Sequence, residues 1–300
     1  MTPSRHGPVL ITGLDHSGKT PLRVVLDAHP ALALARRTYF WTRFDGRFGS
    51  LDRPANLARC IDALSRHGPL AALGIDLDGV ASRLAPGLAT YDRLFALIGE
   101  EYARSRGRPR WGIQESLLER HADRLLAAYP NVRIIQMVRD PRTWYASVGA
   151  SGARRGGVGV ATAVWKRSSR LALDNAARHP DRYLVMRYEA LVGDGTGALR
   201  QVCEFIGEAL TPGVLEVAGR LDLARDGGEL PASARAFIED EAGGLMAALG
   251  YHGTADRRGA RELRYRLSTR PVGRAAGMAW RAAEWTTLVV TRLLPGARER

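Results

Sequence analysis

A glycine-bounded loop near the start of the chain has the residue types that bind a phosphate-like anion. Gly13 to Thr20 fit the pattern G-x-x-x-x-G-K-S/T and follow an apolar run, Val9 to Thr12. In this pattern, backbone N–H groups turn inward around an anion, and the N-terminus of the following helix adds partial positive charge. Lys19 supplies a mobile cation, and Thr20 supplies a hydroxyl that can reach a phosphate oxygen or a magnesium ion. The loop therefore predicts a phosphate or phosphosulfate site.

A second candidate anion site follows another apolar run, at residues 133–138. Arg139 comes directly after this run, and Ser147 comes eight residues after Arg139. The dipeptide Asp140-Pro141 signals a turn after a strand. A guanidinium holds a phosphate through a planar fork of donors, and a serine on the following helix would add one more. The alternative is a surface Arg/Asp pair beside a helix N-cap.

The elements that would position these residues alternate along the chain. Apolar runs predict strands at 9–12, 132–138 and 183–186. Helical spacing and helix-ending residues predict helices from 20 to His29-Pro30, over 55–105 with breaks near 68 and 86, and at 117–129, 144–148, 161–178 and 199–206. Such alternation favours an α/β, P-loop-like three-layer fold with a central parallel sheet flanked by helices. In such a sheet, a ligand lies across the carboxyl ends of the strands.

The composition says more about what the protein binds than about which reaction it catalyses. Among 300 residues, 44 Lys+Arg against 31 Asp+Glu give a net charge of +13. This balance suits a nucleotide, an acidic glycan, a nucleic acid or an anionic membrane surface, or simply an arginine-rich proteome. Cys60 and Cys203 are far apart, without metal-ligand spacing, and are typical of core cysteines in a reducing compartment. Met1 to Pro8 lack the apolar core of a signal peptide, so we expect a cytoplasmic protein.

The C-terminal segment differs in character from the rest of the chain. Residues 270–300 place tryptophans and leucines among arginines, as in an interfacial amphipathic helix. The alternative is a helix docked on the domain. We therefore expect an α/β domain over 1–269 and an amphipathic helical tail over 270–300 that packs on the domain or contacts a membrane peripherally.

Several motifs together resemble the sulfotransferases that use 3′-phosphoadenosine 5′-phosphosulfate (PAPS). In that family a strand leads into a loop G-x-P-R/K-S-G-T-T/S, and the following helix ends in L-x-x-H-P. The matching residues are Ser17, Gly18, Thr20, Leu26, His29, Pro30, Trp111-Gly112, Arg139-Asp140-Pro141-Arg142, Ser147, the run Arg187-Tyr188-Glu189-Ala190-Leu191, and Leu199 to Gly207. The resemblance covers about residues 9–207.

This resemblance implies transfer of a sulfuryl group from PAPS to an acceptor hydroxyl, of a glycan or a small metabolite. It implies that the 5′-phosphosulfate binds the loop and that Arg139 and Ser147 hold the 3′-phosphate. The nucleotide-binding residues would be Asp15, His16, Ser17, Gly18, Lys19, Thr20, Arg139, Ser147 and Tyr188. Lys19 would neutralise the leaving phosphate, assisted by a protonated His16, without a metal. We expect no nucleic-acid partner.

The loop also departs from the family pattern. His16 stands where the family usually has Lys or Arg, and Lys19 where it has Thr or Ser. Gln114 stands where related enzymes often have a lysine that contacts the sulfonate. Arg37 falls where the tyrosine-sulfating enzymes have an acidic base, and an arginine cannot act as a base at neutral pH. The base therefore stays open, with Asp15, His16 and Glu115 as the nearest candidates.

Two other functions stay open. A P-loop kinase or NTPase using ATP and magnesium fits the loop, with Asp140 as the metal ligand. A non-catalytic protein that binds a nucleotide or an acidic glycan fits the basic charge and the missing base. Whichever function holds, the arginines and aromatics of residues 36–54 are expected to line a cleft or form a substrate lip, or to form an aromatic cluster beneath a loop.

Overall fold

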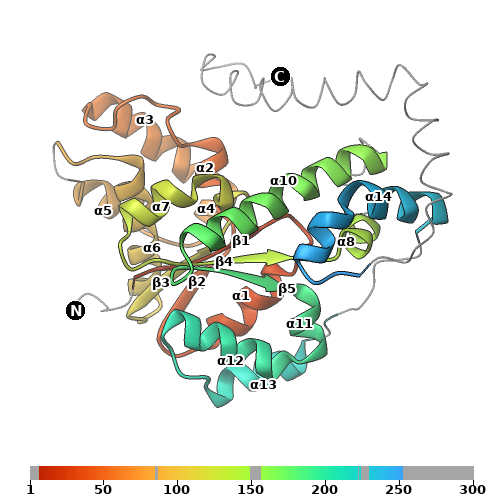
Figure 1. The fold of residues 1–300 in the computed structure, drawn as a ribbon. Helices are drawn as coiled ribbons and strands as arrows, with labels where there is room; N and C mark the ends of the chain where they lie inside the picture. The colour runs from red at the N-terminus through yellow and green to blue at the C-terminus, as the bar shows by residue number, and fades with distance from the viewer. Residues whose placement is uncertain (1–6, 85–86, 149–156, 222, 224–229, 253–300) are drawn as a thin grey trace, which may run out of the picture.

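Five parallel strands form one sheet at the centre of the protein (Figure 1). The structure is a computed structural model that describes residues 7–84, 87–148, 157–221, 223 and 230–252. The strands are β1 (Val9–Gly13), β2 (Leu32–Ala35), β3 (Arg110–Gln114), β4 (Arg133–Val138) and β5 (Tyr183–Arg187), in the spatial order β2-β3-β1-β4-β5. This order confirms the expected parallel α/β sheet, with β1 between β3 and β4.

The central strand is buried along its whole length. All five residues of β1 are buried, and Leu10 pairs with Ile113 on β3 and Ile134 on β4. Because both faces of a parallel sheet are covered, its inner strands are continuous apolar runs. Leu10 packs in one hydrophobic cluster, and its neighbours Val9 and Ile11 pack in another on the opposite face.

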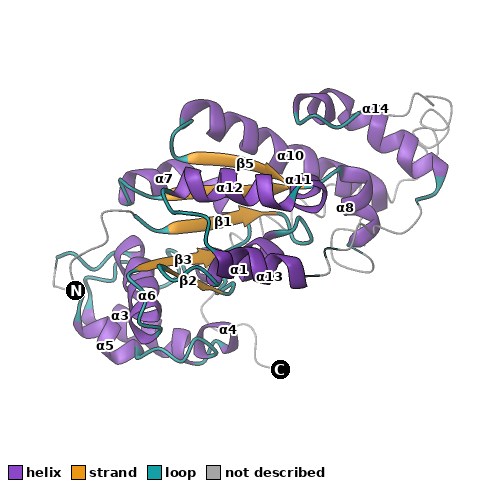
Figure 2. Ribbon diagram, turned by 90° about the horizontal axis from the view of Figure 1, so that it is seen from below, coloured by secondary structure: helices purple, strands orange, loops and turns teal. Residues whose placement is uncertain are grey.

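Helices cover both faces of this sheet. The helices are α1 (Lys19–Asp27), α2 (Phe40–Arg43), α3 (Pro54–Ser65), α4 (Gly68–Ala71), α5 (Leu77–Ser82), α6 (Tyr91–Ser105), the 3₁₀ helix η1 (Leu118–His121), α7 (Ala122–Ala128), α8 (Pro141–Ser147), α10 (Gly157–Arg178), α11 (Tyr188–Gly193), α12 (Gly195–Ile206), α13 (Pro212–Arg220) and α14 (Ala232–Ala248). Figure 2 shows α1, α12 and α13 together on one face, where their apolar side chains share a cluster with β1 and β4. Helices α6 and α7 pack on the other face, and α10 packs on β5 and α14.

Two strands are missing from the sequence prediction, β2 and β3. The β2 sequence, Leu-Ala-Leu-Ala, has only four residues and no β-branched side chain, so nothing in its pattern favours a strand. The β3 sequence begins with a charged residue and contains Gly112. Arg110 is nevertheless buried, because Glu208 and the carbonyls of Gly7 and Ile206 accept its hydrogen bonds. These partners are distant in sequence, so the pattern of β3 alone does not predict them.

Other predicted elements agree in place but differ in extent. The helix expected at 117–129 is divided into η1 and α7, and the one expected at 161–178 begins at Gly157. The helical stretch at 55–105 is the insertion α3 to α6, which lies beside the β2 edge in Figure 1. Residues 270–300, the predicted tail, lie outside the described residues. None of the described helices is long and apolar enough to cross a membrane.

Candidate active site

The glycine loop joins β1 to α1 in a conformation that requires its glycines. Gly13 and Gly18 have φ angles of 122° and 94°, in a region that L side chains rarely adopt. A Cβ atom on Gly13 would stand 2.3 Å from the Met137 carbonyl oxygen, and one on Gly18 would stand 2.3 Å from the Tyr188 ring. The loop is therefore pressed against the ends of β4 and β5, where the second predicted site begins.

One buried polar side chain in this loop has no partner among the described residues. Ser17 donates its backbone N–H to the Leu14 carbonyl at 3.2 Å, and Trp144 of α8 donates its indole N–H to the Asp15 carbonyl at 2.7 Å. These bonds hold the loop closed. The Ser17 hydroxyl is buried, and no described residue hydrogen-bonds to it. Since buried polar atoms are nearly always paired, an unpaired hydroxyl at the centre of the loop indicates a ligand position.

Lys19 extends back across the mouth of the loop. Its Nζ donates to the Gly13 carbonyl and to Ser116 Oγ, both at 2.6 Å, and to Asp15 Oδ1 at 3.3 Å. The side chain is only 3% exposed. Burial lowers the pKa of this ammonium, although the charges of Asp15 and Glu119 favour its protonated form. Lys19 is therefore a buried cation, and the neighbouring carboxylates compensate its charge only partly.

Asp15 is the acidic partner of this lysine. Its Oδ1 also accepts from Arg37 and Ser116, both at 2.7 Å, while its side chain remains 58% exposed. Burial acts to raise its pKa, but Lys19, Ser116 and Arg37 outweigh it, so the pKa of Asp15 is below its ordinary value. The carboxylate thus stays charged at neutral pH and faces solvent beside Lys19.

A cavity of about 630 Å³ opens beside the loop. Its lining combines loop residues, basic and polar side chains, and an apolar wall from the helical insertion: Asp15, His16, Gly18, Lys19, Thr20, Pro21, Arg23, Arg36, Arg37, Tyr39, Pro69, Ala72, Leu73 and Gln114. Gln114, at the end of β3, donates to Thr20 Oγ1 at 3.1 Å. This volume is within the range of small-molecule sites.

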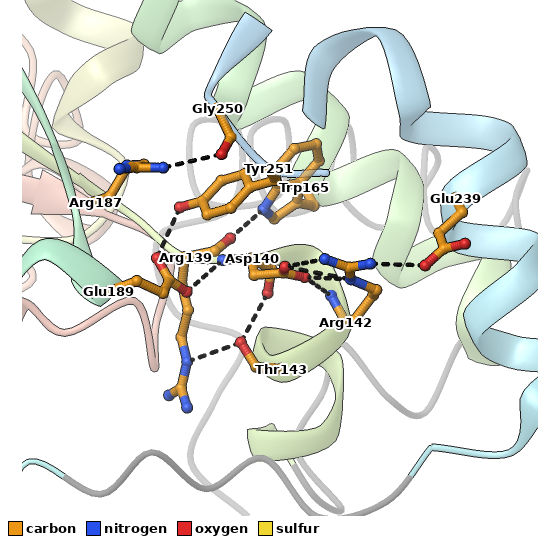
Figure 3. A network of polar contacts seen from close by, with 10 residues as sticks. All are labelled: Arg139, Asp140, Arg142, Thr143, Trp165, Arg187, Glu189, Glu239, Gly250 and Tyr251. Atoms are coloured by element: carbon orange, nitrogen blue, oxygen red, sulfur yellow. Dashed lines mark hydrogen bonds and ion pairs between the residues drawn. The ribbon is translucent and has the colours of Figure 1, made fainter. Parts of the chain in front are cut away.

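Arg139 lies at the end of β4, on the other side of the loop. Its guanidinium stacks over the Tyr188 ring at 4.6 Å and donates to the His16 carbonyl at 3.3 Å and to Thr143 Oγ1 at 3.4 Å. In Figure 3 the guanidinium extends away from the nearby carboxylates, and none of the described carboxylates forms an ion pair with it. A smaller cavity of about 230 Å³ opens here, lined by Arg139, Thr143, Tyr188, Glu189, Val192 and Gly193.

A polar network anchors the backbone that carries Arg139 (Figure 3). Glu189 accepts from the Asp140 N–H at 2.9 Å and from the Tyr251 hydroxyl at 3.0 Å, while Trp165 donates to the Arg139 carbonyl at 2.8 Å. Asp140 caps α8 through the Arg142 N–H and pairs with the Arg142 guanidinium, which also pairs with Glu239. The carboxylate of Asp140 is therefore used to fix the turn after β4.

The predicted site residues fall into two groups. The larger cavity is lined by Asp15, His16, Gly18, Lys19, Thr20 and Gln114, and the smaller one by Arg139 and Tyr188. Ser17 is buried in the loop and lines neither cavity. Ser147 lies on the last turn of α8 and donates its hydroxyl to the Trp144 carbonyl at 2.7 Å. The hydroxyl that contacts Arg139 belongs instead to Thr143, one helical turn earlier, which the sequence analysis overlooked.

Glu115, which the sequence offered as a candidate base, does not lie at the larger cavity. It is fully buried, and its carboxylate accepts from the Thr38 N–H and hydroxyl and from the Tyr39 N–H, at 2.7 to 3.0 Å. Burial raises its pKa, and these donors counteract that effect. This residue fixes the turn after β2 and does not line the cavity, whereas Asp15 and His16 do.

Comparison with known proteins agrees with the fold. A model of the sulfotransferase family matches residues 8–212, about two thirds of the chain. The chain therefore belongs to the sulfotransferase family. No curated protein sequence matches it.

Several solved structures that are similar to this chain are sulfotransferases or sulfotransferase domains. The sulfotransferase domain of the Synechococcus PCC 7002 olefin synthase is 21% identical with a TM-score of 0.54, over 85% of this chain and 99% of that one. The sulfotransferase domain from the curacin biosynthetic pathway is 18% identical with a TM-score of 0.52, over 83% and 99%. The mouse sulfotransferase SULT7A1, solved with PAP, is 10% identical with a TM-score of 0.39, over 93% and 90%. The first two likenesses show the shared fold.

Proposed function

We propose that this protein transfers the sulfuryl group of PAPS to a hydroxyl of a small acceptor or a glycan. The observation that carries the proposal is a pair of anion sites on opposite sides of one loop. On one side are the backbone of the loop, the unpaired Ser17 hydroxyl and the buried ammonium of Lys19. On the other side is Arg139, stacked on Tyr188 and not paired with a described carboxylate. A nucleotide that carries anions at both its 5′ and 3′ ends matches two such sites.

In this proposal the loop binds the 5′-phosphosulfate of PAPS. The backbone N–H groups from Asp15 to Thr20 other than that of Ser17, with the Ser17 and Thr20 hydroxyls, would surround it, as oriented N–H groups surround anions in such loops. His16 lies in the same loop and lines the cavity. The 3′-phosphate would bind Arg139, with Ser147 and Tyr188 beside it, and Thr143 joins this set because it already contacts the guanidinium.

The chemistry assigned to the side chains is positioning and charge neutralisation. The acceptor oxygen attacks sulfur in line, the bond from sulfur to the bridging oxygen breaks, and adenosine 3′,5′-bisphosphate (PAP) leaves. Lys19 would neutralise the charge that grows on the leaving phosphate, as cations do in phosphoryl transfer. The acceptor proton would pass to a base in the cavity, which leaves Asp15 and His16 of the three candidates.

The magnesium-dependent alternative has less support. It requires a carboxylate at the end of a buried strand that is available to a metal ion. The candidate, Asp140, instead caps α8 and pairs with Arg142. The binding-protein alternative predicts tight nucleotide binding without turnover.

Turnover of sulfur-labelled PAPS tests the proposal directly. The protein should form PAP and a labelled sulfate ester when it is given a mixture of hydroxyl compounds. Wild-type protein that binds PAP but forms no labelled ester with any of them would support the binding-protein alternative. Protein that binds ATP with magnesium but not PAP would support the kinase alternative.

A further inference from the structure

The larger cavity contains basic groups that the proposed transfer does not use. Three arginines line it, Arg23, Arg36 and Arg37, in addition to Lys19. Arg37 is paired with Asp15 at 2.7 Å, and Asp15 is the only carboxylate among the described residues that line the cavity. Arg36 is exposed and has no hydrogen bond or ion pair with any described residue. The cavity thus has an excess of positive charge beyond the loop.

Arg23 is a second arginine whose charge is only partly compensated. Its side chain is 13% exposed, its Nη1 donates to the Leu34 carbonyl at 3.3 Å, and Asp27 is 3.6 Å away. Its Nε is buried and has no partner among the described residues. Burial lowers the pKa of Arg23, Asp27 acts against this, and Arg36 is close enough to lower it further. Two neighbouring guanidinium groups with an unused donor are a site for an anion.

The remaining wall of the cavity is aliphatic. It consists of Pro69, Ala72 and Leu73 from the helical insertion. The aromatic side chains of residues 36–54 offer no free face to a sugar ring here. Trp41 and Phe44 are each only 4% exposed and pack in the core, and Arg37 and Arg43 stack against Tyr39 at 4.4 and 5.2 Å. Residues 36–54 therefore contribute most of their aromatic side chains to the hydrophobic core and some of their arginines to the lining of the cavity.

We propose that the acceptor carries an anionic group, a carboxylate or a phosphate monoester, which Arg36 and Arg23 bind, and an aliphatic part that packs on Pro69, Ala72 and Leu73. The proposal rests on the proposed sulfuryl transfer, because it assumes that the reacting hydroxyl meets the sulfonate at Lys19. It assigns a substrate class to this cavity: anionic amphiphiles with a hydroxyl.

Matched probes test this class. Octyl β-D-glucoside, octyl β-D-glucuronide and octyl β-D-glucoside 6-phosphate share their alkyl chain and ring hydroxyls and differ in charge. Binding of each to the protein with PAP is measured by calorimetry, and sulfation from labelled PAPS is measured as kcat/KM. At least one charged probe should bind about tenfold or more tightly than the neutral glucoside, which is what one charge-assisted hydrogen bond contributes. Tighter binding of the glucuronide would indicate an acceptor with a carboxylate, and tighter binding of the 6-phosphate an acceptor with a phosphate.

Two variants locate the effect. Arg36→Gln, at an exposed position, should reduce the charged-to-neutral affinity ratio to about one, and Arg23→Gln should reduce it as well. Arg47→Gln is the control, because Arg47 has the same charge, lies in the same segment and does not line the cavity. Equal affinities of wild-type protein for all three probes, or an equal ratio in Arg36→Gln and Arg47→Gln, would overturn the proposal.

The failure of this proposal and the failure of the proposed function are distinguishable. PAP affinity should be the same in wild type, Arg36→Gln and Arg47→Gln, because the nucleotide is assigned to the loop and Arg139. If wild-type protein does not bind PAP, the proposed function fails. If PAP binds normally but charge on the probe has no effect, only the acceptor assignment fails.

Discussion

At the scale of single residues, Lys19 stands out because its charge is held in an unfavourable place. It is almost fully buried, so burial lowers its pKa, and Asp15 compensates only partly from 3.3 Å. An anion bound in the loop would favour the ammonium. Interactions that strengthen as charge moves to the leaving group raise the rate constant more than they raise binding.

Replacement of this lysine should therefore affect turnover more than affinity. Lys19→Met should lower kcat about 100-fold or more and weaken PAP less than tenfold, in line with the loss of other transition-state donors. Lys166→Met is the matched control, since Lys166 pairs with Glu241 of α14 and lines neither cavity. Steady-state kinetics measures kcat, and calorimetry measures the affinity for PAP. A normal kcat with weakened PAP would indicate ground-state binding only.

The lowered pKa of Lys19 also has a consequence for the pH profile. An ammonium group keeps its charge below its pKa and loses it as pH rises through that pKa. A lowered pKa therefore moves the loss of charge to a lower pH. Wild-type kcat/KM for PAPS, which reports the free enzyme, should fall on the alkaline side with a midpoint below 10.5, the ordinary pKa of lysine. Lys19→Arg should retain whatever activity it has to higher pH, because a guanidinium stays protonated. An identical alkaline midpoint in both proteins, with circular dichroism unchanged, would contradict this role.

At the scale of elements, a buried carboxylate joins the strand before the loop to the helices behind it. Glu119 of η1 accepts from Thr12 of β1 at 2.6 Å and from Ser168 of α10 at 2.9 Å. Its carbonyl accepts from Asn175 of α10 at 2.9 Å. The bonds hold three elements in register directly beneath the loop.

Removal of this carboxylate should destabilise the fold. Glu119→Ala removes the acceptor to which two buried hydroxyls, those of Thr12 and Ser168, donate, and should lower the free energy of unfolding by about 2–4 kcal/mol. Urea denaturation measures it. Glu204→Ala, at an exposed position of α12, is the control and should change stability by less than about 0.5 kcal/mol. Equal stability of the two variants would show that the bonds to Glu119 contribute little.

The sequence predicts an element when its pattern is local and misses it when its partners are distant. The runs that became β1, β4 and β5 are apolar in themselves, and the glycine loop has a pattern of its own. β3 depends on Glu208 to bury Arg110, and no spacing along the chain indicates this pair. Thr143, Trp144 and Glu119 are likewise found only through tertiary contacts, and so are the positions of Arg23 and Arg36 around one cavity.

At the scale of the whole molecule, the parallel topology brings the two anion sites together. Carboxyl ends of β1, β3 and β4 lie at one edge of the sheet, and β1 lies between the other two, so the loop separates the two cavities. The residues assigned to the two phosphate sites all lie before residue 190 of the chain. Residues 270–300 therefore stand outside the machinery that we propose.

Truncation after Ser268 tests this division of the chain. The shortened protein should bind PAP with the affinity of the full chain. If the tail contacts membranes, the full chain should bind vesicles of anionic lipid and the shortened chain should not. Loss of PAP binding in a folded, shortened protein would mean that the tail completes the nucleotide site.

The central claim is that one nucleotide occupies both anion sites, and calorimetry of three nucleotides tests it most directly. Wild-type protein should bind PAP at least about tenfold more tightly than adenosine 5′-phosphosulfate or ATP with magnesium, because only PAP has a 3′-phosphate for Arg139. Arg139→Ala should remove the advantage of PAP and leave adenosine 5′-phosphosulfate nearly unchanged. The claim is contradicted if ATP with magnesium binds most tightly, or if Arg139→Ala weakens PAP and adenosine 5′-phosphosulfate equally.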